Sequence, residues 1–129
     1  GRVADLRAGY ALHLTRRAGN AKGRELAALW MPPYITEFLH LGEQGWIALA
    51  DAYTFLADLA AGTPDAAGLD GEPLFLPLAD CRVYAPLRPS KLIAVGRNYP
   101  GYTQFPGKAP GKIPTGFIKT ASAITGPGR

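Results

Sequence analysis

The chain has 129 residues, of which 14 are Lys or Arg and 10 are Asp or Glu, so its formal net charge is +4. The apolar fraction of 47% and the charged fraction of 19% are ordinary for a globular protein and argue against wholesale disorder. The single cysteine, Cys81, excludes an internal disulfide framework and a thiolate metal cluster, and it fits a reducing compartment.

The charge is unevenly divided along the sequence. Residues 1–80 contain six basic and ten acidic side chains, for −4, whereas residues 81–129 contain eight basic side chains and no acidic one, for +8. The C-terminal third therefore cannot supply a carboxylate base or a carboxylate metal ligand. The sequence shows no signal-peptide pattern and no apolar stretch of about 18 residues, so we expect a cytoplasmic protein that does not enter a membrane.

Helices are expected in the first half of the chain. Residues 3–17 place apolar side chains at roughly helical spacing, although Gly9 weakens the pattern and Val3 could instead end a strand. A short helix over residues 24–30 is stopped by two consecutive prolines, and residues 36–41 form one or two further turns.

The clearest helix covers residues 43–61. An apolar stripe along it predicts a face that packs against the core, formed by Trp46, Leu49, Ala50, Tyr53, Leu56 and Ala60. Gly62 follows as a residue that could end the helix in the left-handed conformation. Residues 62–73 are rich in Gly, Pro and Asp, which indicates an exposed loop or linker.

Short apolar runs in the second half predict strands. They cover residues 74–78, 83–85, 92–95 and 117–119, with prolines between the second and the third. The irregular final third has little capacity for a core of its own. It is interpreted either as a functional loop on a scaffold or as a piece whose partner structure is absent.

Three side chains that often carry chemistry have simpler interpretations here. His13 and His40 lie on predicted helices without a second metal ligand four residues away, which indicates surface or packing residues. Cys81 has no histidine pattern near it and is interpreted as a small buried hydrophobic residue.

Residues 96–99 (GRNY) directly follow the strand predicted at 92–95. A guanidinium, an amide and a phenol therefore lie at the carboxyl end of a strand. Arg97 can bind a carboxylate through two hydrogen bonds, Asn98 can orient a carbonyl group, and Tyr99 can donate to an enolate oxygen. The alternative interpretation of the same residues is a surface turn that contains an arginine.

Three sequence segments, in this order along the chain, resemble the fumarylacetoacetate hydrolase family. Residues 1–6 (GRVADL) are similar to the G-x-V-x-D-L of the family's smaller N-terminal domain. Residues 89–99 (PSKLIAVGRNY) are similar to the pattern P-x-K-I-I-x-V-G-x-N-Y that precedes its active-site loop. Residues 113–128 (IPTGFIKTASAITGPG) are similar to its P-x-x-F-x-K-x-x-S-x-I-x-G-P-G element.

The resemblance implies an α+β fold in two parts. A small α/β N-terminal domain is expected at residues 1–88, with a linker at 62–73. The first strands of a mostly β catalytic domain are expected at residues 89–129, and this catalytic domain is incomplete in the chain.

The resemblance also implies an activity and the residues that serve it. Its members are homodimeric enzymes that use Mg²⁺ or Mn²⁺ to hold an enolate, and they hydrolyse, decarboxylate or isomerise β-keto or diketo acids. By resemblance, the anionic substrate is bound by Arg97, Asn98, Tyr99 and Lys119.

Two departures from the family pattern bear on the mechanism. The family loop N-Y-x-x-H-x-x-E supplies a His and a Glu that activate water, but Tyr102 and Phe105 stand at those positions here. Neither is a good base at neutral pH, so Tyr102 is a doubtful catalytic residue. The family's metal ligands, two Glu and an Asp, follow its G-P-G element. We therefore expect the metal ligands to lie outside this chain, which is interpreted as cut at both ends.

Two other functions stay open on the sequence. The basic residues 81–129 carry interleaved aromatic side chains and could bind nucleic acid or another polyanion, although net charge is a non-specific signal. The chain could also belong to a catalytically inactive scaffold of the same family.

Overall fold

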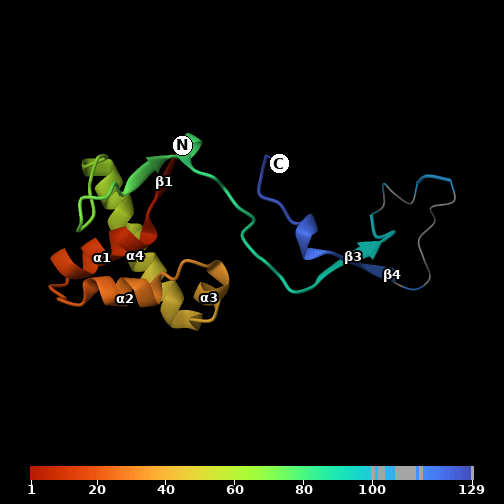
Figure 1. Cartoon of the computed structure of the whole chain (residues 1–129), viewed down its shortest axis with the longest axis horizontal. Helices are drawn as coiled ribbons and strands as arrows, with labels where there is room; N and C mark the ends of the chain where they lie inside the picture. The colour runs from red at the N-terminus through yellow and green to blue at the C-terminus, as the bar shows by residue number, and fades with distance from the viewer. Residues whose placement is uncertain (100, 102–103, 107–112, 114, 129) are drawn as a thin grey trace. The chain divides into compact units, whose positions relative to one another are not determined.

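The computed structural model describes residues 1–99, 101, 104–106, 113 and 115–128. The chain divides into unit 1 (Gly1–Arg82) and unit 2 (Val83–Arg129). Unit 1 contains helices α1 to α4 and a small sheet, and unit 2 contains a second small sheet (Figure 1). The described residues therefore combine helices with small antiparallel sheets, which confirms the coarse α+β expectation. The sequence predicts a domain boundary after residue 88, whereas the structure divides the chain after Arg82.

The two ends of unit 1 are joined by a short antiparallel sheet. Strand β1 (Arg2–Ala4) pairs with strand β2 (Phe75–Pro77), and Val3 lies opposite Leu76. The alternative in which Val3 belongs to a strand is thus the one that the structure shows. The strand predicted at 74–78 is shorter than expected, because the short 3₁₀ helix η1 (Leu78–Asp80) follows β2 directly.

Helix α1 (Leu6–Arg16) begins at a capping residue. The Asp5 carboxylate Oδ1 accepts a hydrogen bond from the backbone N–H of Ala8 at 2.9 Å, and this bond satisfies one of the free donors of the first helical turn. The acidic residue of the GRVADL segment therefore has a structural role as a helix cap.

The next three helices follow the sequence pattern closely. Helix α2 (Gly23–Trp30) ends just before the two prolines, α3 (Ile35–Leu39) is a short turn of helix, and α4 (Gly42–Gly62) is the long helix. The left-handed end expected at Gly62 is wrong, because Gly62 is the last helical residue and the cap is Thr63.

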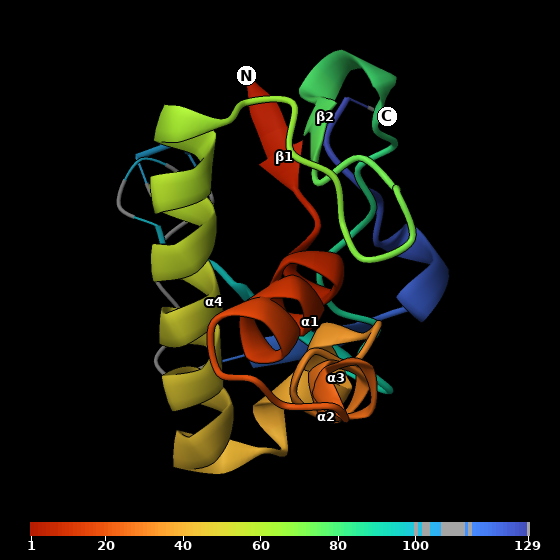
Figure 2. The same cartoon turned by 90° about the vertical axis from the view of Figure 1, so that its left-hand side faces the viewer.

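Helix α1 crosses beside α4, which runs along one side of unit 1 (Figure 2). The two helices approach closely at Gly9, where an added Cβ atom would lie 2.5 Å from Cδ2 of Leu56. The core around this contact has two clusters. One contains Tyr10, Ala11, Ala27, Met31, Ala48 and Ala52, and the other contains Leu12, Phe55, Leu56 and Leu74.

The predicted core face of α4 is largely wrong. Leu56 is buried as expected, but Trp46 is 55% exposed and Tyr53 is 68% exposed. The face that packs inward is built mainly from small residues and one aromatic residue, namely Gly45, Ala48, Ala52, Phe55 and Leu56. Small side chains suffice there because α1 lies close enough to fill the space.

The composition indicated an exposed loop or linker at residues 62–73. Gly62 is the last residue of α4, and residues 63–73 form a loop inside unit 1. Leu69 packs against both core clusters, and the loop leads into Leu74, which is fully buried. The backbone N–H of Asp5 donates to the Leu74 carbonyl oxygen at 2.9 Å, so the loop is tied to the start of α1.

His13 is a packing residue, as the sequence indicated. Its ring stacks on Tyr10 at 6.0 Å between centroids and lies 5.0 Å from the ring of Phe55. Cys81 is only partly buried, with its thiol 3.4 Å from the Pro77 carbonyl oxygen, so the expectation of a buried cysteine is wrong.

Unit 2 is built around strands β3 (Leu92–Gly96) and β4 (Thr115–Lys119), which pair antiparallel, with the short 3₁₀ helix η2 (Ala121–Ala123) after them. No strand forms at residues 83–85, because no second strand pairs with this segment among the described residues. No described residue of unit 2 is buried. A two-stranded sheet of this kind is marginally stable by itself.

Candidate functional site

The candidate site lies at the carboxyl end of β3. Arg97, Asn98 and Tyr99 follow the last strand residue, Gly96, and all three side chains are exposed. Within the described part of the chain, none of the three side chains forms a hydrogen bond or an ion pair. The segment therefore follows a strand, as the sequence predicted, whereas its role as a binding site stays a prediction.

Arg97 has a backbone conformation that the sequence did not predict. Its φ is +55°, which places a residue other than glycine in the left-handed region. This conformation costs an L-residue about 1–2 kcal/mol. Residues held in such a conformation often occur at ligand sites, where the backbone must turn a side chain out of the regular alternation of a strand. No sequence signal marks it, because the residue types that usually adopt this conformation are Gly, Asn and Asp.

The charge around Arg97 favours an anionic ligand. Residues 81–129 contain no acidic side chain, so the guanidinium has no carboxylate partner within this stretch of the chain. An exposed arginine can form two parallel charge-assisted hydrogen bonds with a carboxylate. Asn98 and Tyr99 add an amide and a phenol directly beside it, and Tyr99 is 74% exposed.

Lys119 lies at the other end of the same sheet. The register pairs Lys119 with Leu92 and pairs Gly96 with Thr115. With a rise of about 3.4 Å per residue, the backbone of Lys119 is roughly 14 Å along the strand from the Gly96 end. The Lys119 ammonium group lies 5.1 Å from the ring centre of Phe117, so the side chain leans back along β4 toward Thr115. The structure thus brings Arg97, Asn98 and Tyr99 together but leaves Lys119 apart from them.

The loop after Tyr99 contains the two positions at which this chain departs from the family pattern, and only one of them is described. Tyr102 lies outside the described residues. Phe105, at the position of the family's glutamate, is described and is exposed. The departure from the family pattern therefore rests on residue types alone.

The family-like G-P-G element has a packing role in unit 2. A Cβ atom at Gly126 would collide with the carbonyl oxygen of Val83 and would approach the backbone of Tyr84 to 3.1 Å. Only glycine allows the two segments to lie this close. A hollow of about 370 Å³ beside this contact is lined by residues that include Leu87, Arg88, Ile124 and Thr125. Arg88 is the single charged residue in the lining of this hollow, so the hollow does not contain a cluster of charged groups that could act together.

The described residues do not form the metal site that the resemblance implies. No group of three or more His, Cys, Asp or Glu side chains is placed to hold a metal ion among residues 1–99, 101, 104–106, 113 and 115–128. The expectation that Mg²⁺ or Mn²⁺ is held by ligands outside this chain stays a prediction.

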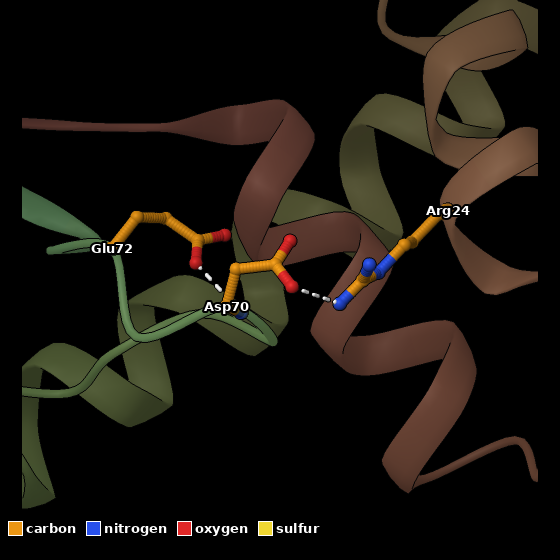
Figure 3. Close-up of polar contacts among 3 residues, drawn as sticks. All are labelled: Arg24, Asp70 and Glu72. Atoms are coloured by element: carbon orange, nitrogen blue, oxygen red, sulfur yellow. Dashed lines mark hydrogen bonds and ion pairs between the residues drawn. The ribbon is translucent and has the colours of Figure 1, made fainter.

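Unit 1 contains a separate apolar pocket of about 870 Å³, lined by residues that include Met31, Phe38, Trp46, Leu49 and Leu69. The polar groups on its rim already have structural partners. Arg24 pairs with Asp70 at 2.5 Å, and the Glu72 carboxylate accepts a hydrogen bond from the Asp70 backbone N–H at 2.8 Å (Figure 3). These contacts tie the loop before β2 to helix α2, and they leave no acid–base pair directed into the pocket.

Comparison with known proteins gives one distant relative. No protein-family model and no solved structure matches the sequence. Protein Rv2993c of Mycobacterium tuberculosis (strain ATCC 25618 / H37Rv) is 38% identical to the chain over 72 residues, which are 56% of this chain and 25% of that protein. The chain thus spans about a quarter of the length of the curated relative that it matches.

The membrane expectation can be compared with the helices. None of the helices in the described part of the chain combines the length and the apolar character that are needed to cross a bilayer.

Proposed function

We propose that the chain belongs to an enzyme of the fumarylacetoacetate hydrolase type, in which the segment after β3 binds the carboxylate of a β-keto or diketo acid. The observation that carries this proposal is the conformation of Arg97. An exposed arginine with a φ of +55° stands directly after a strand, in a segment of the chain that has no carboxylate of its own. Backbone strain of this kind often occurs at ligand sites, and the Arg97 guanidinium has no partner among the residues that the structure describes.

Each of the three adjacent side chains has a chemical role in the proposal. The Arg97 guanidinium binds the substrate carboxylate through two hydrogen bonds, which fixes the orientation of the keto acid. The Asn98 amide donates to a carbonyl oxygen, and the Tyr99 hydroxyl donates to the oxygen on which negative charge develops as an enolate forms. Lys119 is a second cation of the same sheet, and its backbone lies at the opposite end of the β3–β4 ladder from Arg97.

The complete enzyme requires groups beyond these residues. The metal that the family resemblance implies would act as a Lewis acid, and its ligands would come from residues that this chain does not contain. The general base is also unassigned, since a tyrosine replaces the expected histidine at position 102. Hydrolysis, decarboxylation and isomerisation of the keto acid are therefore all compatible with the proposed binding site, as is a homodimeric assembly.

The test is turnover by the full-length protein. Oxaloacetate and an acylpyruvate are supplied separately in the presence of Mg²⁺, and loss of the enol absorbance is followed together with pyruvate formation. We expect turnover of at least one substrate, and we expect a chelator to abolish it. Absence of turnover with both substrates would contradict the enzyme proposal and would favour the inactive scaffold.

A second function is favoured by the surface of unit 2. Four aromatic side chains that lie among basic residues are exposed, namely Tyr84, Tyr99, Phe105 and Phe117. Exposed rings beside cations can stack on the bases of single-stranded nucleic acid. This alternative predicts salt-dependent binding of single-stranded DNA, and no binding at low salt would exclude it.

A further inference from the structure

Within unit 1, helix α4 has an outer face that is largely without a partner, although the Trp46 ring at its edge packs edge-on against Phe38 of α3, with the ring centres 5.2 Å apart. This outer face consists of Trp46, Ile47, Ala50, Tyr53, Thr54, Ala57 and Ala61, all of which are exposed. It lies opposite the buried side of the helix, because residues three, four and seven positions apart share one face of an α-helix. The fully exposed side of a helix in a globular protein is normally polar, whereas this one, after Glu43 in the first turn, has a single polar side chain between Trp46 and Ala61, namely Thr54.

The composition of the outer face is typical of an interface. Three large side chains, Trp46, Ile47 and Tyr53, are exposed to between 50% and 68%. Tryptophan and tyrosine are enriched at protein contacts, where they often contribute most of the binding energy. The small side chains of Ala50 and Ala57 form a shallow depression on the helix surface, so that another chain can approach the helix axis closely. Scattered apolar residues need no explanation, but a continuous strip along several turns does.

The charge beside the strip is acidic. Glu43, Asp51 and Asp58 are all exposed, and helix α4 contains no Lys or Arg. Asp51 and Asp58 are seven residues apart and therefore lie along the same side of the helix. Arg17 of α1 contacts helix α4 at another residue, with its guanidinium carbon 5.3 Å from the centre of the Phe55 ring. No ion pair joins Asp51 or Asp58 to any of the residues that the structure describes.

This charge selects among the possible occupants of the outer face. A second copy of α4 would bring its own carboxylates against these, and like charges at a contact oppose association. Anionic lipid and nucleic acid are repelled by the same groups. A segment that carries Lys or Arg beside apolar side chains matches both the strip and its acidic edge. We propose that the outer face of α4 binds a basic amphipathic helix of a partner protein.

The test uses the full chain and a defined probe. The probe is a fluorescently labelled helical peptide of about 18 residues that contains only Leu and Lys, with Leu at positions that share one face. A second peptide with Glu in place of Lys has the same apolar face and the opposite charge. We expect fluorescence anisotropy to detect saturable binding of the Lys peptide, and we expect salt to weaken it. The Glu peptide should bind at least about tenfold more weakly.

Two matched variants locate the binding. The target variant combines Tyr53→Ser, Asp51→Asn and Asp58→Asn, and all three positions are exposed. The control variant makes the same kinds of change away from α4, with Leu29→Ser, Asp65→Asn and Asp80→Asn, also at exposed positions. We expect the target variant to bind the Lys peptide about tenfold more weakly and the control variant to bind it within about twofold of the unmodified chain. Circular dichroism verifies that both variants remain folded.

Three results would overturn the proposal. Equal losses of affinity in the target and control variants would mean that the peptide binds through the overall charge of the chain and not at the outer face. Equal binding of the two peptides would mean that charge does not select the partner. Self-association of the unmodified chain that Tyr53→Ser abolishes, measured by sedimentation, would assign the outer face to a second copy instead.

Discussion

Replacement of Gly9 by alanine tests the close contact between α1 and α4. Gly9 lies in the middle of α1, where alanine would normally be preferred to glycine by about 1 kcal/mol because it loses less backbone entropy. The structure predicts the opposite result, because a Cβ atom at this position would lie between 2.5 and 2.7 Å from three carbon atoms of Leu56. Carbon atoms in ordinary contact are about 3.5–4.0 Å apart.

The magnitude follows from the burial of Leu56. This side chain is 3% exposed and packs in the cluster with Leu12, Phe55 and Leu74, so it has no free space into which it can move. Overpacking of a filled core costs about 1–3 kcal/mol, and contact with three atoms places the cost near the upper limit. After the gain in helix propensity is subtracted, we expect Gly9→Ala to lower the free energy of unfolding by about 2 kcal/mol. For a unit of this size, that change lowers the unfolding temperature by roughly 8–16 °C.

The assay is thermal and urea unfolding followed by far-ultraviolet circular dichroism, which reports α1 to α4. Gly62→Ala is the matched control, because Gly62 is helical and nothing lies within 4 Å of an added Cβ atom. It should raise the free energy of unfolding by about 0.5–1 kcal/mol. In a Leu56→Ala background the clash is removed, so Gly9→Ala should become neutral or stabilising. Equal stabilisation by Gly9→Ala and Gly62→Ala would refute the close contact.

Three further predictions concern unit 1. Asp5→Ala should lower the free energy of unfolding by about 1 kcal/mol through loss of the helix cap, whereas Asp5→Asn should retain most of it in the same urea titration. Burial, and then the Asp51 carboxylate, raise the pKa of Tyr10 above its usual value near 10.0. The Tyr10 hydroxyl therefore ionises at a lower pH in the unfolded state than in the folded state. The stability that the neutral hydroxyl contributes is complete below about pH 10 and is lost as the pH rises through the folded pKa. Tyr10→Phe should reduce the loss of stability between about pH 9 and pH 11, and an unchanged slope would contradict it. Leu74→Ala should cost about 2–5 kcal/mol and Leu29→Ala less than about 0.5, since Leu74 is fully buried and Leu29 is 57% exposed.

The helices of unit 1 could be predicted from the sequence because their signals are local. The proline pair ends α2, and the long apolar period defines α4 within a residue at each end. The buried face of α4 could not be predicted, because the aromatic side chains of Trp46 and Tyr53 outweigh the alanines in any hydrophobicity pattern. The alanines are buried because α1 lies close to α4, and this proximity depends on the packing of two distant segments.

The candidate site shows the same division between local and non-local information. The position of Arg97 after a strand follows from the apolar run before it. The left-handed conformation of Arg97 does not, because arginine rarely adopts it. The distance of Lys119 from that residue depends on the register between β3 and β4, which the sequence of either strand does not determine.

The measurement that tests the central claim most directly is the effect of Arg97→Gln on keto-acid binding. In the full-length protein with Mg²⁺, the KM for the substrate that shows turnover is compared with that of a Lys91→Gln variant. Lys91 is an exposed cation of the same unit, next to the other end of β3. A lost bond between an arginine and a carboxylate costs about 1.5–3 kcal/mol, so we expect KM to rise about 10- to 100-fold for Arg97→Gln and to change little for Lys91→Gln. An unchanged KM for Arg97→Gln, or equal increases in both variants, would contradict a carboxylate site at Arg97.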